Sequence, residues 1–353
     1  MPREKIISAD EVELDSQTSV ASALPRKVSE DDNVLRPQRM FDMIGQREVF
    51  ERIQIAVQAA RNRKEPLGHI LFDGPPGLGK TTFATCIPRE LGVPMQIGNG
   101  ATLKAPKDVV PYLTNASEGS VLFIDEIHRM QKTVEEFLYT AMEDFRIDIT
   151  VGEGINARTL NLQLRPFTLI GATTRTGLIS APLRDRFQMR EHLDFYSTSE
   201  LSEIVKRSAV KLKMALDDTA ANEIASRSRG TPRLANNRLR WVRDYADAKS
   251  NGQVTLNVAL DALKMLGIDT IGLDQQDRKY LETLLRVFGG GPAGVESIAH
   301  TMNVAPDTLE DEVEPYLLRS ELLIRTSKGR RLTPTGFIHL GEDPTKYERE
   351  SLF

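Results

Sequence analysis

The chain has 353 residues, of which 40% are hydrophobic and 27% are charged, an ordinary composition for a globular protein. Its formal net charge of −4 argues against a protein that binds nucleic acid over its whole surface, although a local basic patch remains possible. The chain has a single cysteine, Cys86, which excludes a disulfide framework. Since its five histidines are scattered, the sequence predicts no cysteine- or histidine-based metal site. Since no apolar run reaches about 18 residues and no signal-peptide pattern opens the chain, we expect a cytoplasmic protein that does not cross a membrane.

The first 196 residues predict a tail followed by an α/β domain. Residues 1–34 are polar and acidic with no sustained period, so we expect a mobile tail. Apolar residues at helical spacing follow from Gln46 to about Arg63. Three short apolar runs, "HILFDG", "SVLFIDE" and "PFTLIGATT", are typical of strands buried in a parallel sheet, and helical patterns separate them. Alternating apolar residues over 146–165, around Gly152 and Gly154, predict a β-hairpin inserted into this 35–196 domain.

Two smaller domains are expected after residue 196. The stretch 197–268 is helical throughout, with Ser197 and Asp217 as candidate N-caps. Residues 269–345 begin with helices and end with two extended pieces around the basic turn "RTSKGRR", which is typical of a winged-helix domain. The last residues, 346–353, are expected to form a short tail.

The clearest motif is a phosphate-binding loop. "GPPGLGKT", from Gly74 to Thr81, matches the pattern G-x-x-x-x-G-K-[ST] and lies between a predicted strand and a predicted helix. Glycines such as Gly77 and Gly79 let backbone N–H groups converge on phosphate oxygens, and the helix directs its positive end at the same anion. Lys80 would reach the terminal phosphates and the Thr81 hydroxyl would coordinate Mg²⁺. The loop predicts binding of ATP or GTP.

Polar residues follow the second and third apolar runs. Asp125 and Glu126 end "VLFIDE", and ligands of open α/β sheets bind at the carboxyl ends of the strands. Asp125 would hold Mg²⁺ and Glu126 would polarise the attacking water. Thr173 and Thr174 end the third run, where a hydroxyl could bind the attacking water or the γ-phosphate, or could simply end a strand. "DEIH" also fits two-core helicases, but the chain has no room for a second core.

Several basic residues allow two interpretations. Arg184 and Arg186 in "PLRDRF" are either surface charges or a finger that enters a neighbouring subunit's nucleotide site. Arg233 in "RGTPR" stands at the start of a predicted helix, after a Gly and a Pro, and it too could be a plain surface charge. The segment from Arg325 to Arg331 carries four positive charges in seven residues, after the acidic "EDEVEPY", which we expect to face away from DNA. This basic turn is either solvated or a weak, sequence-independent phosphate contact.

Taken together these motifs resemble those of AAA+ ATPases. The segments "YTAMEDF", "DITVGEG", "PFTLIGATTR", "PLRDRF", "RGTPR" and "FGGGPAG" extend the resemblance, over about residues 34–340, to the RuvB family of bacterial Holliday-junction branch-migration motors. The resemblance implies a RecA-like ATPase domain, a helical lid domain and a winged-helix DNA-binding domain. It also implies a homohexameric ring on duplex DNA that acts at Holliday junctions in recombination and repair. RuvA would dock on the hairpin, and the RuvC resolvase would join the larger assembly.

The resemblance also implies roles for individual residues. In the ATP site, the resemblance implies that the phosphates are bound by Lys80, Thr81 and Thr82, and that Asp125 and Glu126 form the Walker B pair. It implies that Thr174 is the first sensor, Arg233 the second sensor and Arg186 the arginine finger in trans. The adenine pocket would consist of Leu35, Arg36 and Tyr196. On the surface it implies a partner contact by Ile147, Ile149 and Leu162, and DNA contacts by Arg325, Lys328 and Arg330. In "GTPRLANNRLRWVRD" the chain departs from the family, because Trp241 stands where arginine is common.

Three other functions are compatible with parts of this sequence. A clamp-loader-like or initiator-like switch would use ATP to place another protein on DNA, but the hairpin and the basic turn favour the motor. A nucleotide-binding scaffold without turnover is disfavoured by the presence of Asp125, Glu126 and Arg186. A small-molecule kinase would leave the two C-terminal domains without a task.

Overall fold

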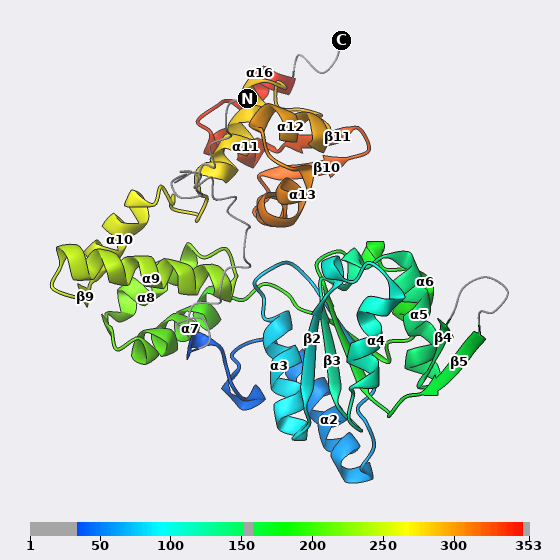
Figure 1. The fold of residues 1–353 in the computed structure, drawn as a ribbon. Coiled ribbons are helices and arrows are strands. Elements are labelled where there is room, and N and C mark those ends of the chain that lie inside the picture. The colour runs from blue at the N-terminus through cyan, green and yellow to red at the C-terminus, as the bar shows by residue number, and fades with distance from the viewer. Residues whose placement is uncertain (1–33, 152–157, 349–353) are drawn as a thin grey trace, which may run out of the picture. The chain divides into compact units, whose positions relative to one another are not determined.

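The central element of the N-terminal domain is a five-stranded parallel sheet. The computed structural model describes residues 34–151 and 158–348, and every structural statement below concerns these residues. The strands have the order β2-β3-β6-β1-β7, and Figure 1 shows β2 and β3 side by side in this sheet. Their bounds are β1 (Ile70–Asp73), β2 (Met95–Asn99), β3 (Val121–Asp125), β6 (Thr168–Thr173) and β7 (Met189–His192). The three predicted apolar runs are the three inner strands, β1, β3 and β6, as their burial on both faces requires.

Helices cover both faces of this sheet because successive strand residues point to opposite sides. Ile70 and Phe72 pack in one hydrophobic core with α2 (Arg47–Arg63) and α3 (Lys80–Leu91). Leu71 points to the second core, which contains α4 (Pro106–Thr114) and α5 (Lys132–Glu143). Short helical elements complete the domain: η1 (Met40–Asp42), η2 (Gly100–Thr102), η3 (Ile127–Arg129), η5 (Thr176–Leu178) and α6 (Ala181–Asp185).

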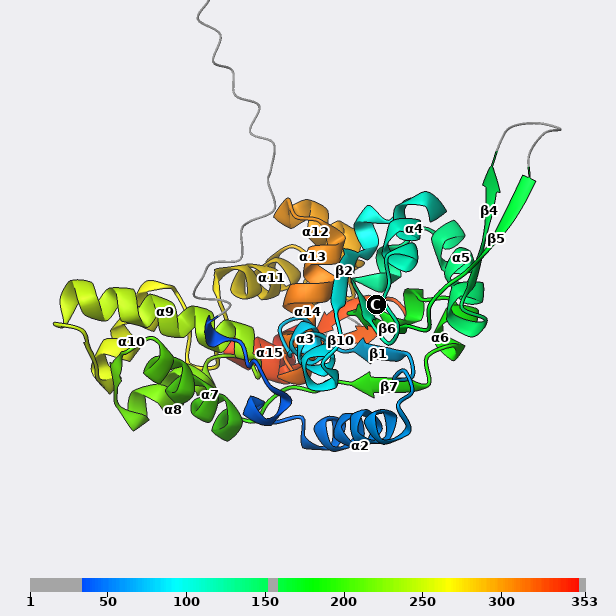
Figure 2. The ribbon, with the colours of Figure 1, turned by 60° about the horizontal axis from the view of Figure 1, so that its bottom comes forward.

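The predicted hairpin is present as β4 (Arg146–Val151) and β5 (Arg158–Gln163). The two strands pair antiparallel, with Ile147 opposite Leu162 and Ile149 opposite Leu160, so these four apolar residues share one face. The predicted turn glycines lie outside the described residues. Figure 2 shows the two strands extending from the α5 side of the domain.

The lid region is helical, with one addition to the prediction. It contains α7 (Thr198–Lys211), α8 (Asp218–Ser226), α9 (Pro232–Lys249) and α10 (Leu256–Met265), together with the two-residue strands β8 (Ala215–Leu216) and β9 (Gln253–Val254), which pair in parallel. Ser197 caps α7 by accepting the Glu200 N–H, whereas Asp217 is an N-cap residue without a side-chain capping bond. No helix within the described ranges is both long and apolar enough to cross a bilayer.

The C-terminal region builds a third hydrophobic core of its own. Its helices are α11 (Gln275–Arg286), α12 (Val295–Met302), α13 (Pro306–Thr308), a π-helical turn η6 (Leu309–Val313), α14 (Glu314–Arg319), α15 (Pro334–His339) and α16 (Pro344–Glu348). The predicted extended pieces are β10 (Leu323–Thr326) and β11 (Gly329–Leu332), which form an antiparallel pair. Helices followed by this pair match the predicted winged-helix arrangement.

Candidate functional site

The phosphate loop connects the end of β1 to the start of α3. Gly74 has φ +126°, and a Cβ there would lie 2.4 Å from the carbonyl oxygen of Leu193, so this position requires glycine. The loop ends at Gly79, after which α3 begins at Lys80. The Lys80 Nζ donates to the carbonyl oxygens of Gly74 at 2.7 Å and Pro75 at 2.8 Å. The lysine therefore lies folded against the loop, at the place where a phosphate chain would bind.

The charge on Lys80 is set by burial and by nearby carboxylates. Only 7% of the residue is exposed, and this burial lowers the pKa of its ammonium group. The negative charges of Glu126, Asp125 and Asp73 act in the opposite direction on the same pKa. The pair at the end of β3 is therefore close enough to interact electrostatically with the loop lysine.

Glu126 is held in an uncommon backbone conformation just beyond β3. Its φ of 48° and ψ of 47° lie in the left-handed region, which costs a non-glycine residue about 1 kcal/mol or more and is found at functional sites. Its N–H donates to Asp125 Oδ1 at 3.0 Å. A Cβ on Gly100 would lie 2.2 Å from the Glu126 carbonyl oxygen, so the neighbouring turn fits closely around it. Burial and the Asp125 charge raise the pKa of the Glu126 carboxyl, and Lys80 lowers it.

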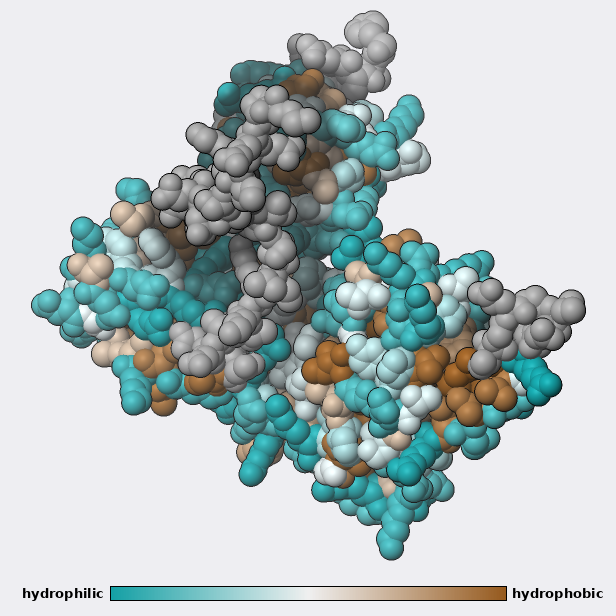
Figure 3. Space-filling model, in the orientation of Figure 1, coloured by the Kyte–Doolittle hydropathy of each residue, from teal (hydrophilic) through white to brown (hydrophobic). Residues whose placement is uncertain are grey.

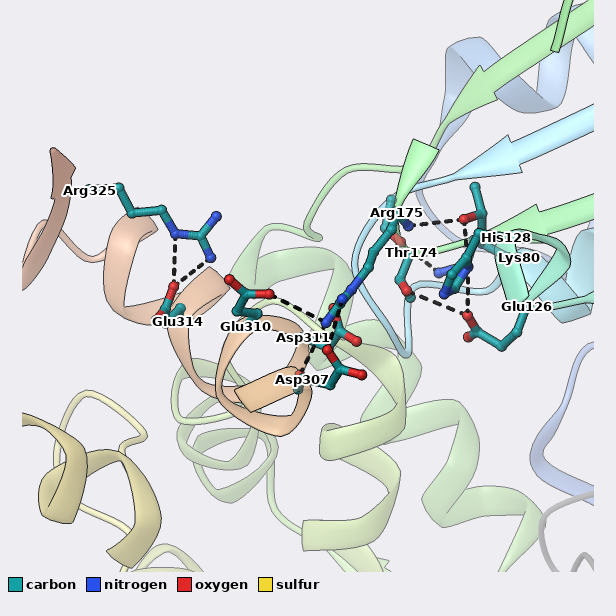
Figure 4. A network of polar contacts seen from close by, with 12 residues as sticks. Lys80, Glu126, His128, Thr174, Arg175, Asp307, Glu310, Asp311, Glu314 and Arg325 are labelled. Atoms are coloured by element: carbon teal, nitrogen blue, oxygen red, sulfur yellow. Dashed lines mark hydrogen bonds and ion pairs between the residues drawn. The ribbon is translucent and has the colours of Figure 1, made fainter. Parts of the chain in front are cut away.

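A polar network joins Glu126 to the end of β6 (Figure 4). Thr174 Oγ1 lies 3.5 Å from Glu126 Oε2, so of the two candidate sensors it is the one next to the carboxylate. Thr173 is fully buried instead, and its Oγ1 lies 2.9 Å from Nδ1 of His128. His128 in turn lies 3.3 Å from Glu126 Oε2, and burial lowers its pKa. No role was predicted for His128, although its place two residues after Glu126 is a visible signal.

The lid region contacts the phosphate loop at Arg233. The Arg233 N–H donates to the Gly77 carbonyl at 3.4 Å, and a Cβ on Gly77 would lie 3.0 Å from the Cβ of Arg233. Tyr196, which is buried, donates its hydroxyl to the carbonyl of Leu78 at 3.2 Å. Leu35 is also buried, whereas Arg36 is exposed. Arg233 and Tyr196 thus lie beside the loop, as the second-sensor and adenine-pocket predictions require.

Arg186 is held by residues outside this site. Its Nη2 pairs with Glu143 at 2.8 Å, its Nη1 donates to the Pro182 carbonyl at 2.7 Å, and its guanidinium lies 4.4 Å from the centre of the Tyr139 ring. These neighbours belong to α5 and α6, not to the phosphate loop. The arrangement is compatible with a finger that acts on another subunit, and that role stays a prediction.

Three protein-family models match this chain over most of its described residues. Family models described as the Holliday junction DNA helicase RuvB P-loop domain, the RuvB AAA lid domain and the RuvB C-terminal winged helix domain match residues 35–193, 196–269 and 270–341. The "Holliday junction branch migration complex subunit RuvB" of Rhodopirellula baltica is 67% identical over 309 residues, covering 88% of this chain and 84% of the relative. The chain belongs to the RuvB family.

Other RuvB proteins agree in sequence and structure. The Kosmotoga olearia subunit of the same description is 49% identical over 319 residues, which cover 90% of this chain and 93% of that protein. The solved "RuvB Holliday junction branch migration motor" of Thermotoga maritima superposes with a TM-score of 0.81 at 42% identity, covering 88% of this chain and 99% of that one. A point mutant of the same Thermotoga maritima protein gives a TM-score of 0.82. These matches confirm the predicted fold class.

The hairpin of this RuvB-family chain requires one correction. Ile147 is fully buried in the second core, so it cannot belong to an exposed partner surface. Leu162 is 38% exposed and Leu160, which the prediction omitted, is 50% exposed. Ile149 is half-buried between them and the core. Figure 3 shows apolar side chains gathered at the hairpin, and we call the half-buried Ile149 and the exposed Leu160 and Leu162 together the hairpin patch.

The positive charge of the basic turn is partly neutralised by acidic residues of the same winged-helix region. Arg330 is only 14% exposed and pairs with Glu314 at 2.9 Å and Glu310 at 2.7 Å. Arg325 is 46% exposed and pairs with the same Glu314 at 2.5 Å. Lys328 is exposed between the two strands. Glu310 and Glu314 of the acidic stretch thus bind the arginines of the basic turn. That the acidic stretch faces away from DNA stays a prediction.

Proposed function

We propose that this chain is the ATP-driven motor subunit that moves Holliday junctions, working on duplex DNA in recombination and repair. The observation that carries the proposal is the convergence of Lys80, Glu126, Thr174 and Arg233 on one phosphate loop, in a chain with RuvB-family domains over residues 35–341. The relatives and the Thermotoga maritima structure carry names that describe branch migration. Because the family processes DNA, we place the protein in the cytoplasm.

The site residues fit hydrolysis of a Mg²⁺-bound ATP. The Thr81 hydroxyl and the Asp125 carboxylate are oxygen ligands of the kind that Mg²⁺ prefers. No cluster of three or more His, Cys, Asp or Glu side chains suited to a metal occurs in the described ranges. When bound, the ion would neutralise charge on the β- and γ-phosphates. Gly77, Gly79, Lys80 and Thr82 would hold the phosphates themselves.

Glu126 is the proposed general base. It would accept the proton of the attacking water while the Thr174 hydroxyl, 3.5 Å from its carboxylate, orients that water or the γ-phosphate. The elevated pKa of Glu126 brings the carboxyl closer to the pH at which a general base works best. Leu35, Arg36 and Tyr196 would hold the adenine, and Arg233 would report the nucleotide to the lid because its backbone contacts the loop at Gly77.

We further propose a homohexameric ring with ATP sites at subunit boundaries. Arg186 would leave Glu143 and enter the neighbour's site, where an arginine finger accelerates phosphoryl transfer by about 10³–10⁵-fold. The hairpin patch would bind RuvA, since Leu160 and Leu162 are exposed among the described residues. Lys328 and Arg325 would contact DNA phosphates, with Arg330 supporting them from beneath. RuvC would join the assembly at the junction.

A synthetic four-way junction tests the proposal. The chain with RuvA, ATP and Mg²⁺ should move the junction and release phosphate, whereas Lys80→Ala should do neither. Lys104→Ala, at an exposed lysine, is the matched control and should behave as wild type. Phosphate release without movement of the junction would contradict the motor and favour a loader-like switch. A chain that binds ATP but never hydrolyses it would contradict both.

A further inference from the structure

Arg175 connects the sensor strand to an acidic turn of the winged-helix region. It follows Thr174 directly, and its Nε donates to Asp311 Oδ1 at 2.7 Å. Its Nη1 pairs with Asp307 at 3.0 Å and its Nη2 lies 3.6 Å from Glu310. We call Asp307, Glu310 and Asp311 the acidic turn. Figure 4 shows the Arg175 side chain pointing into this turn, away from Glu126.

The contact is partly shielded from water. The Arg175 side chain is 22% exposed, and those of Asp311 and Glu310 are 30% and 32% exposed, whereas Asp307 is 79% exposed. Hydrogen bonding to Asp311 is the main reason why the pKa of Arg175 lies above its usual range. A network in which three carboxylates share one guanidinium is stronger than an isolated surface pair.

On its inner side Arg175 is tied to the catalytic network. Its N–H donates to Thr173 Oγ1 at 2.9 Å, and that oxygen lies 2.9 Å from His128 Nδ1. His128 lies 3.3 Å from the Glu126 carboxylate. A displacement of the Arg175 backbone would therefore act on Thr173, and through His128 on the proposed base.

On its outer side the acidic turn is tied to the basic turn. Glu310, which contacts Arg175, also pairs with Arg330 at 2.7 Å. Arg330 and Arg325 share Glu314, which is fully buried one turn further along. The turn that leads from Glu310 to Glu314 is the π-helical η6, and π-helical turns are rare but occur often at functional sites. An unbroken series of charged contacts thus runs from the end of β6 to the proposed DNA-binding strands.

The acidic turn also lines the phosphate end of the ATP site. Glu310 and Asp311 border a cavity of about 200 Å³, together with Gly74 and Pro75 of the loop and Thr174 of the sensor strand. A triphosphate on the loop would bring negative oxygens toward these two carboxylates. Like charges in a partly dehydrated cavity repel strongly, so the triphosphate and the acidic turn oppose each other there.

We propose that Arg175 is a positioning residue whose ion pairs with the acidic turn hold the winged-helix domain against the ATP site until a triphosphate displaces it. The proposal rests on the ATP site of the proposed function. Triphosphate binding releases the acidic turn from Arg175, which frees β10 and β11 to move with DNA. Loss of the γ-phosphate lets Arg175 bind the acidic turn again. Conversely, DNA that pulls on the basic strands acts through Glu310 and Arg175 on the geometry of Thr173 and Thr174.

Distance measurement between two spin labels tests this. Labels at Ile55→Cys in α2 and Ile338→Cys in α15 report on the two domains, since these side chains are 70% and 66% exposed. The native Cys86 is buried and its thiol pKa is raised to about 11, so it does not take the label. A doubly labelled chain is diluted into excess unlabelled chain, so that only distances within one subunit are measured. A non-hydrolysable ATP analogue is the probe, and its binding is followed separately by fluorescence.

Three variants accompany the labelled chain. Arg175→Ala should show the analogue-bound distance even without the analogue and should no longer respond to it, whereas Arg175→Lys keeps one ion pair and should still respond. Asp311→Asn should tighten analogue binding at least about fivefold, because one repelling charge is removed. Glu312→Gln is the matched control: it removes the same charge from an exposed position in the same turn and should change analogue affinity less than about twofold.

The outcomes separate this inference from the proposed function. If the analogue binds but the distance does not change, or if Arg175→Ala responds as wild type does, the inference is wrong while the ATPase assignment stands. If the analogue does not bind at all, both are wrong. Three results together support the inference: the analogue changes the distance in wild type, Arg175→Ala shows the changed distance without analogue, and Asp311→Asn but not Glu312→Gln tightens analogue binding.

Discussion

Replacement of Glu314 by glutamine tests whether the buried carboxylate holds the winged helix together. Glu314 is 0% exposed. It accepts hydrogen bonds from the Tyr280 hydroxyl at 2.9 Å, from Arg325 Nε at 2.8 Å and from Arg330 Nε at 2.9 Å. Glutamine has nearly the same shape but carries no charge, and its NH₂ group faces donors in place of one carboxylate oxygen.

The expected cost is about 3 kcal/mol. Removal of one partner from a buried ion pair typically costs 3–5 kcal/mol, because a charge is left buried without compensation. Two features place Glu314→Gln at the lower end of that range. Arg330 keeps its second pair with Glu310, and Arg325 is 46% exposed, so it can turn toward water. At Glu310, which is 32% exposed, Gln should cost no more than about 1 kcal/mol, and this variant is the control.

Hydrogen exchange of the amides in α11 and α12 measures the effect in the intact chain. A whole-chain melting curve is unsuitable, because a chain with three cores does not unfold in two states. A loss of 3 kcal/mol in opening free energy accelerates exchange about 10²-fold at fixed pH. If Glu314→Gln accelerates exchange no more than Glu310→Gln does, Glu314 is compensated by water rather than by the arginines, and the reasoning from its burial is refuted.

Three further predictions concern separate parts of the molecule. Mixing Arg186→Ala with Lys80→Ala should restore part of the ATPase activity that each variant lacks alone, and the absence of any rescue in a phosphate-release assay would count against a shared site. Leu160→Ser should weaken RuvA binding at least about tenfold in a titration with unchanged ATPase activity, whereas Ile147→Ala should destabilise the fold by about 2–5 kcal/mol as measured by hydrogen exchange. His69 is buried and accepts the Leu169 N–H at Nδ1, and burial lowers its pKa. Its neutral form therefore contributes stability above pH 6.5 that is lost as the pH falls toward the lowered value. The opening free energy of the β6 amides, measured by hydrogen exchange at about pH 5.5 and 7.5, should differ less between the two pH values in His69→Gln than in wild type.

The sequence predicted an element correctly where its residue pattern is typical of only one kind of structure. Continuous apolar runs gave β1, β3 and β6, because an inner strand of a parallel sheet is buried on both faces. The edge strand β2 was not singled out, since its residues are of mixed exposure and the sequence shows no apolar run there. The short pairing of β8 with β9 was missed for a related reason: two residues are too few to produce a period.

The functional site shows the same division. The phosphate loop and the Asp125–Glu126 pair could be predicted because each motif is local and its chemistry requires those residue types. His128 was passed over because a single histidine after a strand has many possible environments, and only the structure places its ring between Thr173 and Glu126. Ile147 was misplaced because alternation identifies the apolar face of a hairpin but not where that face leaves the core.

The acidic and basic stretches near the C-terminus show why charge runs are hard to interpret from sequence. A run of like charges does not reveal which partners it meets, and Glu310 and Glu314 meet Arg330 and Arg325 across a hairpin register that only folding sets. Among the described ion pairs, those two arginines are engaged while Lys328 and Arg331 are not. Each phosphate contact contributes a slope of about −0.9 to the salt dependence of duplex binding, so the two contacts proposed for Lys328 and Arg325 would hold DNA only weakly in a single winged helix. Weak binding by each subunit is what a translocating ring requires, because every contact must release in turn while the others retain the duplex through their high effective concentration.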